Sequence, residues 1–190
     1  QSAAVCAEAL AACSNRMIPV SIDLNYRSKL WSPGINPIDT LYELVNLCDV
    51  VMGNIWSAQA LLGIKSSVEN SIGKSDVELN AATEESILQL QAIFPKVKTV
   101  AYTCRLDNRY FANIRHNQKW AVSKSFTIGT VVDRVGSGDC FMAGLIYGLS
   151  RHSQLNELID FAAAAAVGKL NEAGDFTRQT VNDITDRIKI

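Results

Sequence analysis

Between residues 130 and 144 the chain reads Thr130-Val131-Val132-Asp133-Arg134-Val135-Gly136-Ser137-Gly138-Asp139-Cys140-Phe141-Met142-Ala143-Gly144. The β-branched beginning predicts a strand, the Gly-Ser-Gly run a tight turn, and the apolar residues beyond it a helix. Such a turn leaves backbone N–H groups without partners at the N-terminus of the helix, where the helix dipole also favours negative charge. We therefore expect an anion to bind at this turn.

The same turn carries a carboxylate of its own. Gly136 and Gly138 permit positive φ and close approach of a phosphate, and Ser137 adds a small hydroxyl donor. Asp139 is then a candidate general base, taking a proton from a hydroxyl while a phosphoryl group arrives. Asp133 is a second carboxylate that could hold a metal-bound water or a substrate hydroxyl. The alternative is a strand–turn–helix junction in which Asp139 is only the N-cap.

The helix that follows the turn has an unusual composition. Residues 141–149 are apolar on all sides, which predicts a buried helix. Gly144 and Gly148 lie four positions apart and would allow a neighbouring element to pack closely. A buried helix whose N-terminus faces a turn is a suitable frame for a phosphate site.

The overall composition is that of an ordinary globular protein. The chain has 190 residues, of which 48% are hydrophobic and 19% charged, with a net charge of −1. This charge gives no general attraction to nucleic acid or an anionic membrane, and no apolar run approaches the ~20 residues of a membrane span. The odd cysteine count, without Cys-x-x-Cys spacing, predicts a reduced, cytoplasmic setting. We expect a small-molecule substrate as the partner.

Helical and strand patterns alternate along the chain. Helices are expected at 2–15, 37–46, 55–62, 76–93, 141–149, 155–170 and after Thr180, and strands at 18–24, 49–53, 98–104, 109–114, 118–123 and before the 136–138 turn. This alternation predicts an α/β fold with a mainly parallel sheet flanked by helices. No linker or repeat interrupts it, so we expect one domain over residues 1–190.

Polar residues mark the expected strand ends. Asp23, Asn54, Thr103 and Asp133 all fall at or just after the end of a predicted strand. In parallel sheets, ligands bind beyond the carboxyl ends of the strands. The four positions therefore predict a single cleft.

A second informative run is Ser21-Ile22-Asp23-Leu24-Asn25-Tyr26-Arg27-Ser28-Lys29-Leu30-Trp31. Asp23, Asn25 and Arg27 alternate, so an extended strand end would place them on one side. Arginine suits bidentate contact with a carboxylate or phosphate, which predicts an anionic ligand. The alternative is a structural ion pair at the strand end.

The 133–139 stretch resembles the signature of the PfkB (ribokinase-like) carbohydrate kinases, Asp-Thr-x-Gly-Ala-Gly-Asp. Arg134 stands at the Thr position and Ser137 at the Ala position. The resemblance implies a ribokinase-like fold, with Asp139 as the base that deprotonates the sugar hydroxyl. It also implies that the amides of Gly136, Ser137 and Gly138 form the anion hole for the transferring phosphoryl group.

Within that family, the 23–31 run is most similar to the 2-keto-3-deoxygluconate kinases. The resemblance implies that Arg27 lies near the acidic sugar and the phosphates, with Asp23 and Asn25 also at the substrate. A sugar acid carries a carboxylate, which gives a cationic Arg27 a physical purpose. Fructokinases and related enzymes have similar runs, so they remain an alternative.

The resemblance also marks positions near the nucleotide. Asn54 aligns with the first residue of an Asn-x-x-Glu motif that helps to organise Mg²⁺ and phosphate, but Ser57 replaces the Glu. The alternative for Asn54 is a helix N-cap. Thr103 fits a Thr-x-Gly motif beside the nucleotide, where Arg105 replaces the Gly. Arg105 could touch a phosphate or be solvated.

Asn171 and Gly174 are similar to the segment that closes the nucleotide site in the family. The resemblance covers roughly the second half of such an enzyme, which implies that the N-terminal part and its lid are missing. We expect these 190 residues alone to have little turnover, and a homo-oligomer at full length.

The function implied by the resemblance is ATP- and Mg²⁺-dependent phosphorylation of a sugar or sugar-acid hydroxyl, with 2-keto-3-deoxygluconate to its 6-phosphate as the leading reaction. No side chain is assigned as a direct metal ligand. The alternatives are a fructokinase- or ribokinase-type sugar kinase, and a non-catalytic fragment that binds nucleotide.

Overall fold

A computed structural model of the protein describes residues 2–31 and 34–189. They form two compact units. The first comprises the described residues of Gln1–Tyr102 together with Arg115–Gln118, and the second comprises Thr103–Ile114 and the described residues of Lys119–Ile190. The hydrogen-bonded order of the strands is β1-β2-β3-β4-β5, with β6 beside β4. The α/β class predicted from the sequence is confirmed, with a mixed sheet.

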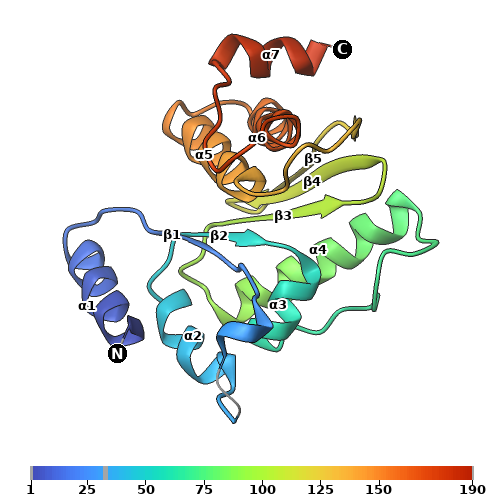
Figure 1. The fold of residues 1–190 in the computed structure, drawn as a ribbon. Helices are drawn as coiled ribbons and strands as arrows, with labels where there is room; N and C mark the ends of the chain where they lie inside the picture. Colours follow the sequence, from blue (N-terminus) through green and yellow to red (C-terminus); the bar gives the residue numbers. More distant parts are fainter. Residues whose placement is uncertain (1, 32–33, 190) are drawn as a thin grey trace. The chain divides into compact units, whose positions relative to one another are not determined.

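The first unit is built on parallel strands. Its elements are α1 (Ser2–Asn15), β1 (Ser21–Asp23), the short 3-10 helix η1 (Ser28–Leu30), α2 (Pro37–Val45), β2 (Val50–Gly53), α3 (Ile55–Leu62), α4 (Asp76–Ile93) and the first residues of β3 (Thr99–Arg105). β2 pairs in parallel with β1 and β3, placing Val51 opposite Ile22 and Val100. Helices α1 to α4 form a row in which each contacts the next (Figure 1).

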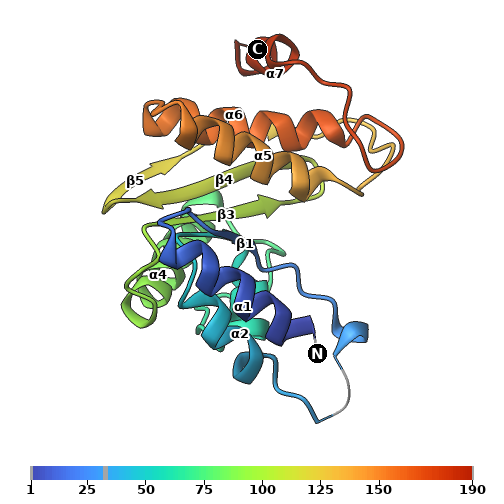
Figure 2. The same cartoon turned by 90° about the vertical axis from the view of Figure 1, so that its left-hand side faces the viewer.

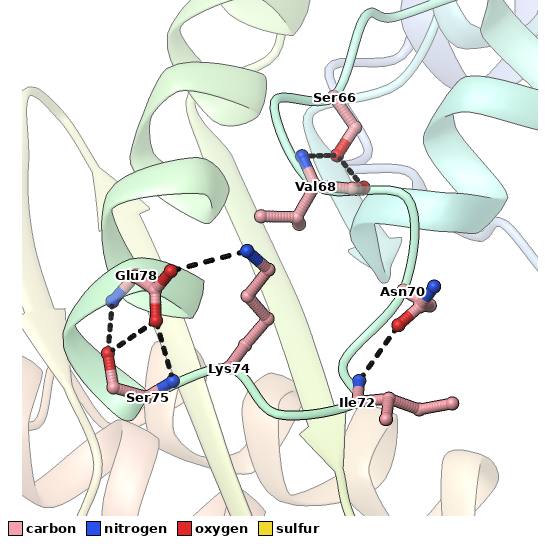
Figure 3. Close-up of polar contacts among 7 residues, drawn as sticks. All are labelled: Ser66, Val68, Asn70, Ile72, Lys74, Ser75 and Glu78. Atoms are coloured by element: carbon pink, nitrogen blue, oxygen red, sulfur yellow. Dashed lines mark hydrogen bonds and ion pairs between the residues drawn. The ribbon is translucent and has the colours of Figure 1, made fainter.

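Helix starts in this unit follow from side chains that take up free backbone N–H groups. Figure 3 shows the connection between α3 and α4, in which the Ser75 hydroxyl accepts from the Glu78 amide at 3.3 Å. The Glu78 carboxylate accepts in turn from the Ser75 amide at 2.9 Å. This reciprocal pair fixes the beginning of α4 at Asp76.

The second unit combines an antiparallel hairpin with three helices. Its elements are the first residues of β4 (Arg109–His116), β5 (Lys119–Val122), β6 (Phe126–Thr127), α5 (Ser137–Ser150), α6 (Leu155–Lys169) and α7 (Val181–Lys189). β6 pairs antiparallel with β4. Helices α5 and α6 lie side by side along β4 and β5, with α7 beyond α6 (Figures 1 and 2).

The two glycines of α5 have the role that their spacing predicts. A Cβ on Gly144 would lie 2.8 Å from the Cα of Ala162, and one on Gly148 would lie 2.6 Å from Cγ of Leu158. Both neighbours belong to α6, whose residues 162–166 are all alanine and all buried. Small side chains on both helices therefore allow close approach, and this confirms the predicted packing.

Two sequence predictions near the 136–138 turn are wrong. Residues 130–133 form no strand, because the amides of Val132 and Asp133 donate to the backbone oxygen of Leu170 rather than to a neighbouring strand. Helix α5 is buried on one face only, and Ile146 on its outer face is 46% exposed. The apolar composition of residues 141–149 suggested burial on all sides of the helix, whereas the buried residues of α5 lie on one face.

Helix α5 begins at Ser137, four residues before the expected start at 141, so Ser137 and Gly138 of the predicted turn belong to the helix. The other helices agree with the sequence within one residue, and β1 is shorter than expected. All five cysteines are free: Cys6 is exposed, Cys13 partly exposed, and the remaining three are buried, namely Cys48, Cys104 and Cys140. Burial raises the pKa of the Cys48 thiol to about 11. Among the described residues, no helix is both long and apolar enough to cross a membrane.

Candidate active site

The candidate site in the second unit is the turn that begins α5. Gly136 is the N-cap of this helix and has a φ of 78°, in the left-handed region that favours glycine. A Cβ at this position would collide with the backbone oxygen of Asp175. Ser137, Gly138 and Asp139 are the first three residues of α5, and the amides of such residues have no acceptor within their own helix. The backbone amides of this turn therefore lie at the start of a helix, and the binding of an anion there remains a prediction.

Asp133 fastens the turn to a second loop. Its Oδ1 accepts from the Val135 amide at 3.0 Å, and its Oδ2 accepts from the Gly174 amide at 3.1 Å. The amides of Val135 and Gly174 hold the pKa of Asp133 below its usual value. Each oxygen keeps a lone pair, so the predicted contact with a substrate hydroxyl or a metal-bound water remains a prediction. What the geometry adds is a bridge between residues 133–136 and the 170–175 loop.

Further bonds join the same two segments. The Leu170 oxygen accepts from the amides of Val132, at 2.8 Å, and Asp133, at 3.3 Å. The Ser137 hydroxyl donates to the Ala166 oxygen inside α6 at 3.1 Å, and Ser137 is buried. This hydroxyl is therefore committed to the protein, and the sequence-based expectation that it serves as an added donor is not realised. Of the two donors of Ser137, the hydroxyl and the backbone amide, only the amide stays available to an anion.

Asp139 lies in the first turn of α5 with its side chain exposed. A carboxylate at this position is accessible to a substrate, and the positive end of the helix dipole favours its negative charge. The N-cap residue is Gly136, so the alternative in which Asp139 is the N-cap is wrong. Its role as the base remains a prediction.

Sequence reasoning missed Lys169, the last residue of α6. Lys169 is completely buried, and its Nζ donates to the Glu172 oxygen at 2.9 Å. Its Cε would lie 3.1 Å from a Cβ on Gly136, so the side chain lies directly against the turn. The one signal in the sequence was a charged residue that ends a run of eight small or apolar positions, most of them alanine.

The predicted nucleotide residues of this unit have different surroundings. Gly174 belongs to the bridge described above, and Asn171 is exposed in the turn that ends α6, where its amide donates to the Gly168 oxygen at 3.2 Å. Thr103 is partly exposed and lies inside β3, so the expectation that it falls at or just after the end of a strand is wrong. Arg105 is the last residue of β3 and is exposed.

The first unit holds three of the predicted substrate residues, while Asp133 belongs to the second unit. β1 ends at Asp23, and the next backbone bonds run from the Asn25 amide to Asp23 and from the Tyr26 amide to Leu24. The chain therefore turns here instead of continuing as the extended strand that the alternation suggested. Asp23, Asn25 and Arg27 are all exposed, whereas Leu24 between them is buried.

Asn54 lies at the carboxyl edge of the same parallel strands, directly after β2. Its Oδ1 accepts from the Ser57 amide at 2.8 Å, and the Ser57 hydroxyl accepts from the Asn54 amide at 2.9 Å. The two residues form a capping box at the start of α3, which is the alternative that the sequence left open. Ser57 thus stabilises the N-terminus of α3, at the position where the family pattern has a Glu.

Residues 2–178 match the pfkB family of carbohydrate kinases. The chain is similar to the solved structure of 2-dehydro-3-deoxygluconokinase from Thermotoga maritima, with a TM-score of 0.82 and 27% identity over 96% of this chain and 53% of that one. It is also similar to a PfkB family carbohydrate kinase from Listeria grayi, with a TM-score of 0.82 and 21% identity over 99% and 55% of the two chains.

A third similar structure is a fructokinase from Xylella fastidiosa with bound ATP, with a TM-score of 0.72 and 21% identity over 98% of this chain and 56% of that one. No curated protein matches the chain. The chain spans about half the length of the solved structures that it resembles. Because the family match covers most of its residues, the chain belongs to the pfkB family of carbohydrate kinases.

Proposed function

We propose that the protein carrying this chain transfers a phosphoryl group from ATP to a hydroxyl of a sugar or sugar acid, and that 2-keto-3-deoxygluconate is the substrate. The observation that carries the proposal is the turn at the start of α5. There, a fixed Gly136 cap, the first amides of the helix and an exposed Asp139 lie within four consecutive residues. Anion binding and proton removal can therefore occur side by side.

The proposed reaction uses these groups as follows. The carboxylate of Asp139 accepts the proton of the substrate hydroxyl, whose oxygen then forms a bond to the γ-phosphorus of ATP. The bond between that phosphorus and the bridging oxygen breaks, and ADP leaves with the electron pair. The amides of Ser137 and Gly138 stabilise the negative charge on the transferring group. Because the turn is fixed by its bonds to the 170–175 loop, the donors are oriented in advance.

Magnesium fits this chemistry as a companion of the nucleotide. Mg²⁺ supplies charge neutralisation on the phosphates and commonly keeps few protein ligands. Among the described residues, no group of three or more His, Cys, Asp or Glu side chains stands together as a metal site. Ser57 of the capping box also offers no carboxylate. We therefore assign no residue as a ligand and route no step through the ion.

The sugar acid is favoured by residues in the first unit. Arg27 is an exposed cation just after β1, near in sequence to Asp23 and Asn25, which offer hydrogen-bonding groups for hydroxyls. A guanidinium suits the carboxylate of a sugar acid better than it suits a neutral sugar. The 27% identity to a 2-dehydro-3-deoxygluconokinase supports the same choice. We also propose a homo-oligomer and a cytoplasmic location for the intact protein.

The decisive experiment measures ATP consumption by the intact protein with Mg²⁺ and 2-keto-3-deoxygluconate, fructose or ribose, beside an Asp139→Asn variant. We expect turnover with 2-keto-3-deoxygluconate and a loss in kcat of about 10²–10⁴-fold in the variant, because the amide cannot accept the proton. Since Asp139 is exposed, the unfolding temperature should stay close to that of the unchanged protein.

A matched control is Asp186→Asn, which removes an exposed carboxylate of α7 that pairs with Lys189 at 2.7 Å. Its kcat should stay at the unchanged level. Preference for fructose or ribose would refute the sugar-acid assignment and favour the alternative kinases. Binding of ATP without turnover on any of the three sugars would support the non-catalytic alternative.

A further inference from the structure

Lys169 is a buried charge that the proposed reaction does not use. Its exposed fraction is 0%, and a lysine is seldom completely buried unless it is paired. Its ammonium has three donors, yet within residues 2–31 and 34–189 its one hydrogen-bond acceptor is the Glu172 oxygen at 2.9 Å. Burying a cation with a single neutral acceptor costs free energy, so another interaction should repay the cost.

The surroundings of Lys169 are parts of the candidate site. Its Cε touches the space above Gly136 that a Cβ would occupy, and its Nζ bonds to the loop that bears Gly174. Its charge adds to the two backbone amides that lower the pKa of Asp133. It also opposes the rise in pKa that burial gives to the Cys140 thiol, one residue after Asp139. A buried positive charge therefore lies between the Gly136 turn and the 170–175 loop.

We propose that Lys169 is a positioning residue of the phosphoryl-transfer site, whose buried cation holds the 170–175 loop against the Gly136 turn and makes the turn more attractive to nucleotide phosphates. The inference rests on the proposed kinase function. Lys169 does not reach solvent, so it acts through the turn and not by touching a ligand. Charges in a water-excluded setting act more strongly than the same charges at the surface.

The test compares Lys169→Met with Lys169→Arg in the intact protein. Methionine keeps an unbranched stem without charge or donors, whereas arginine keeps both. In Lys169→Met we expect the dissociation constant for MgATP, measured by calorimetry, to rise and kcat/KM for ATP to fall, each by about 10–100-fold. Losses of this size are typical when a residue that orients a metal ligand without touching the metal is replaced. Lys169→Arg should retain most of both.

The matched control is Lys124→Met. Lys124 also donates from Nζ to a backbone oxygen, that of Ile188 at 2.6 Å, but it is exposed. ATP affinity should not change in this variant. Equal ATP affinity in Lys169→Met and the unchanged protein would overturn the proposal. So would a loss of kcat that merely follows the folded fraction, with KM and affinity unaltered, because that is the signature of a structural role.

Should Lys169→Met fail to fold, Lys169→Arg is the second variant, because it keeps the positive charge. We expect the folded Lys169→Arg protein to bind MgATP within about threefold of the unchanged protein. A folded arginine variant with a much lower affinity for MgATP overturns the proposal. The binding measurement also separates the two hypotheses. If the unchanged protein binds MgATP but phosphorylates no sugar, the proposed reaction is refuted, while the ATP affinities of the variants still test Lys169.

Discussion

At the scale of single residues, the site depends on one backbone conformation. Gly136 combines a φ of 78° with close contact to the Asp175 backbone, and both demands exclude a side chain. The carboxylate of Asp133 and the buried stem of Lys169 then hold the surrounding loops in place. The sequence marked the glycine and both aspartates, because short motifs report local backbone needs. It did not mark Lys169, because its role comes from burial against residues more than thirty positions away.

Gly136→Ala should destabilise the protein by about 3 kcal/mol, because the left-handed conformation costs roughly 1–2 kcal/mol and the collision with Asp175 adds to it. Thermal or urea unfolding measures the change. Gly73→Ala is the matched control, since Gly73 also has a positive φ of 68° but has nothing within 4 Å of a Cβ. It should cost only about 1 kcal/mol. Equal costs in the two variants would mean that the contact with the 170–175 loop contributes nothing.

At the scale of elements, the seam between α5 and α6 positions the turn. Close approach of the two helices brings the end of α6, with Lys169 and Leu170, beside the start of α5. Four-residue glycine spacing and an alanine run were both visible in the sequence. Their pairing was not, because a sequence shows which faces are narrow but not which of them meet.

Gly144→Ala should destabilise the protein by about 1–3 kcal/mol, because the new methyl group would lie 2.8 Å from the Cα of Ala162, a backbone atom that cannot move aside. Since the seam supports the turn, KM for ATP should rise as well. Gly129→Ala is the control, with nothing within 4 Å of its Cβ and no positive φ. Unfolding midpoints of the two variants give the comparison, and a Gly144→Ala protein as stable as Gly129→Ala would show that the helices are not closely packed.

At the scale of the whole molecule, several carboxylates bond to backbone amides and should make stability depend on pH. Hydrogen bonds from the Ser75 amide lower the pKa of Glu78 below 4.5, and bonds from Thr180 and Val135 lower the pKa of Asp183 and Asp133 below 3.8. A pKa that is lowered in the folded state contributes stability above the unfolded value, and this contribution is lost as the pH falls through the folded value.

We therefore expect the unfolding temperature to be flat near neutral pH and to fall as the pH drops below about 4.5, measured by melting between about pH 6 and about pH 2. Replacing Glu78 by Gln should make that fall shallower, because one such carboxylate is removed. An unfolding temperature that stays constant down to about pH 2 would contradict the role of these bonds.

The amino-acid sequence was enough to predict the α/β class, nearly all the helix bounds, a glycine turn at residue 136 and the carboxylate three residues after it. These features depend on periodicity, capping and backbone freedom, all of which act within a few residues. Only the tertiary structure showed that residues 130–133 are not a strand and that Ser137 bonds into α6. It alone placed a buried lysine behind the turn. Those outcomes depend on which distant segments share a surface, and in this chain the 170–175 loop, not a neighbouring strand, takes up the backbone bonds of the turn.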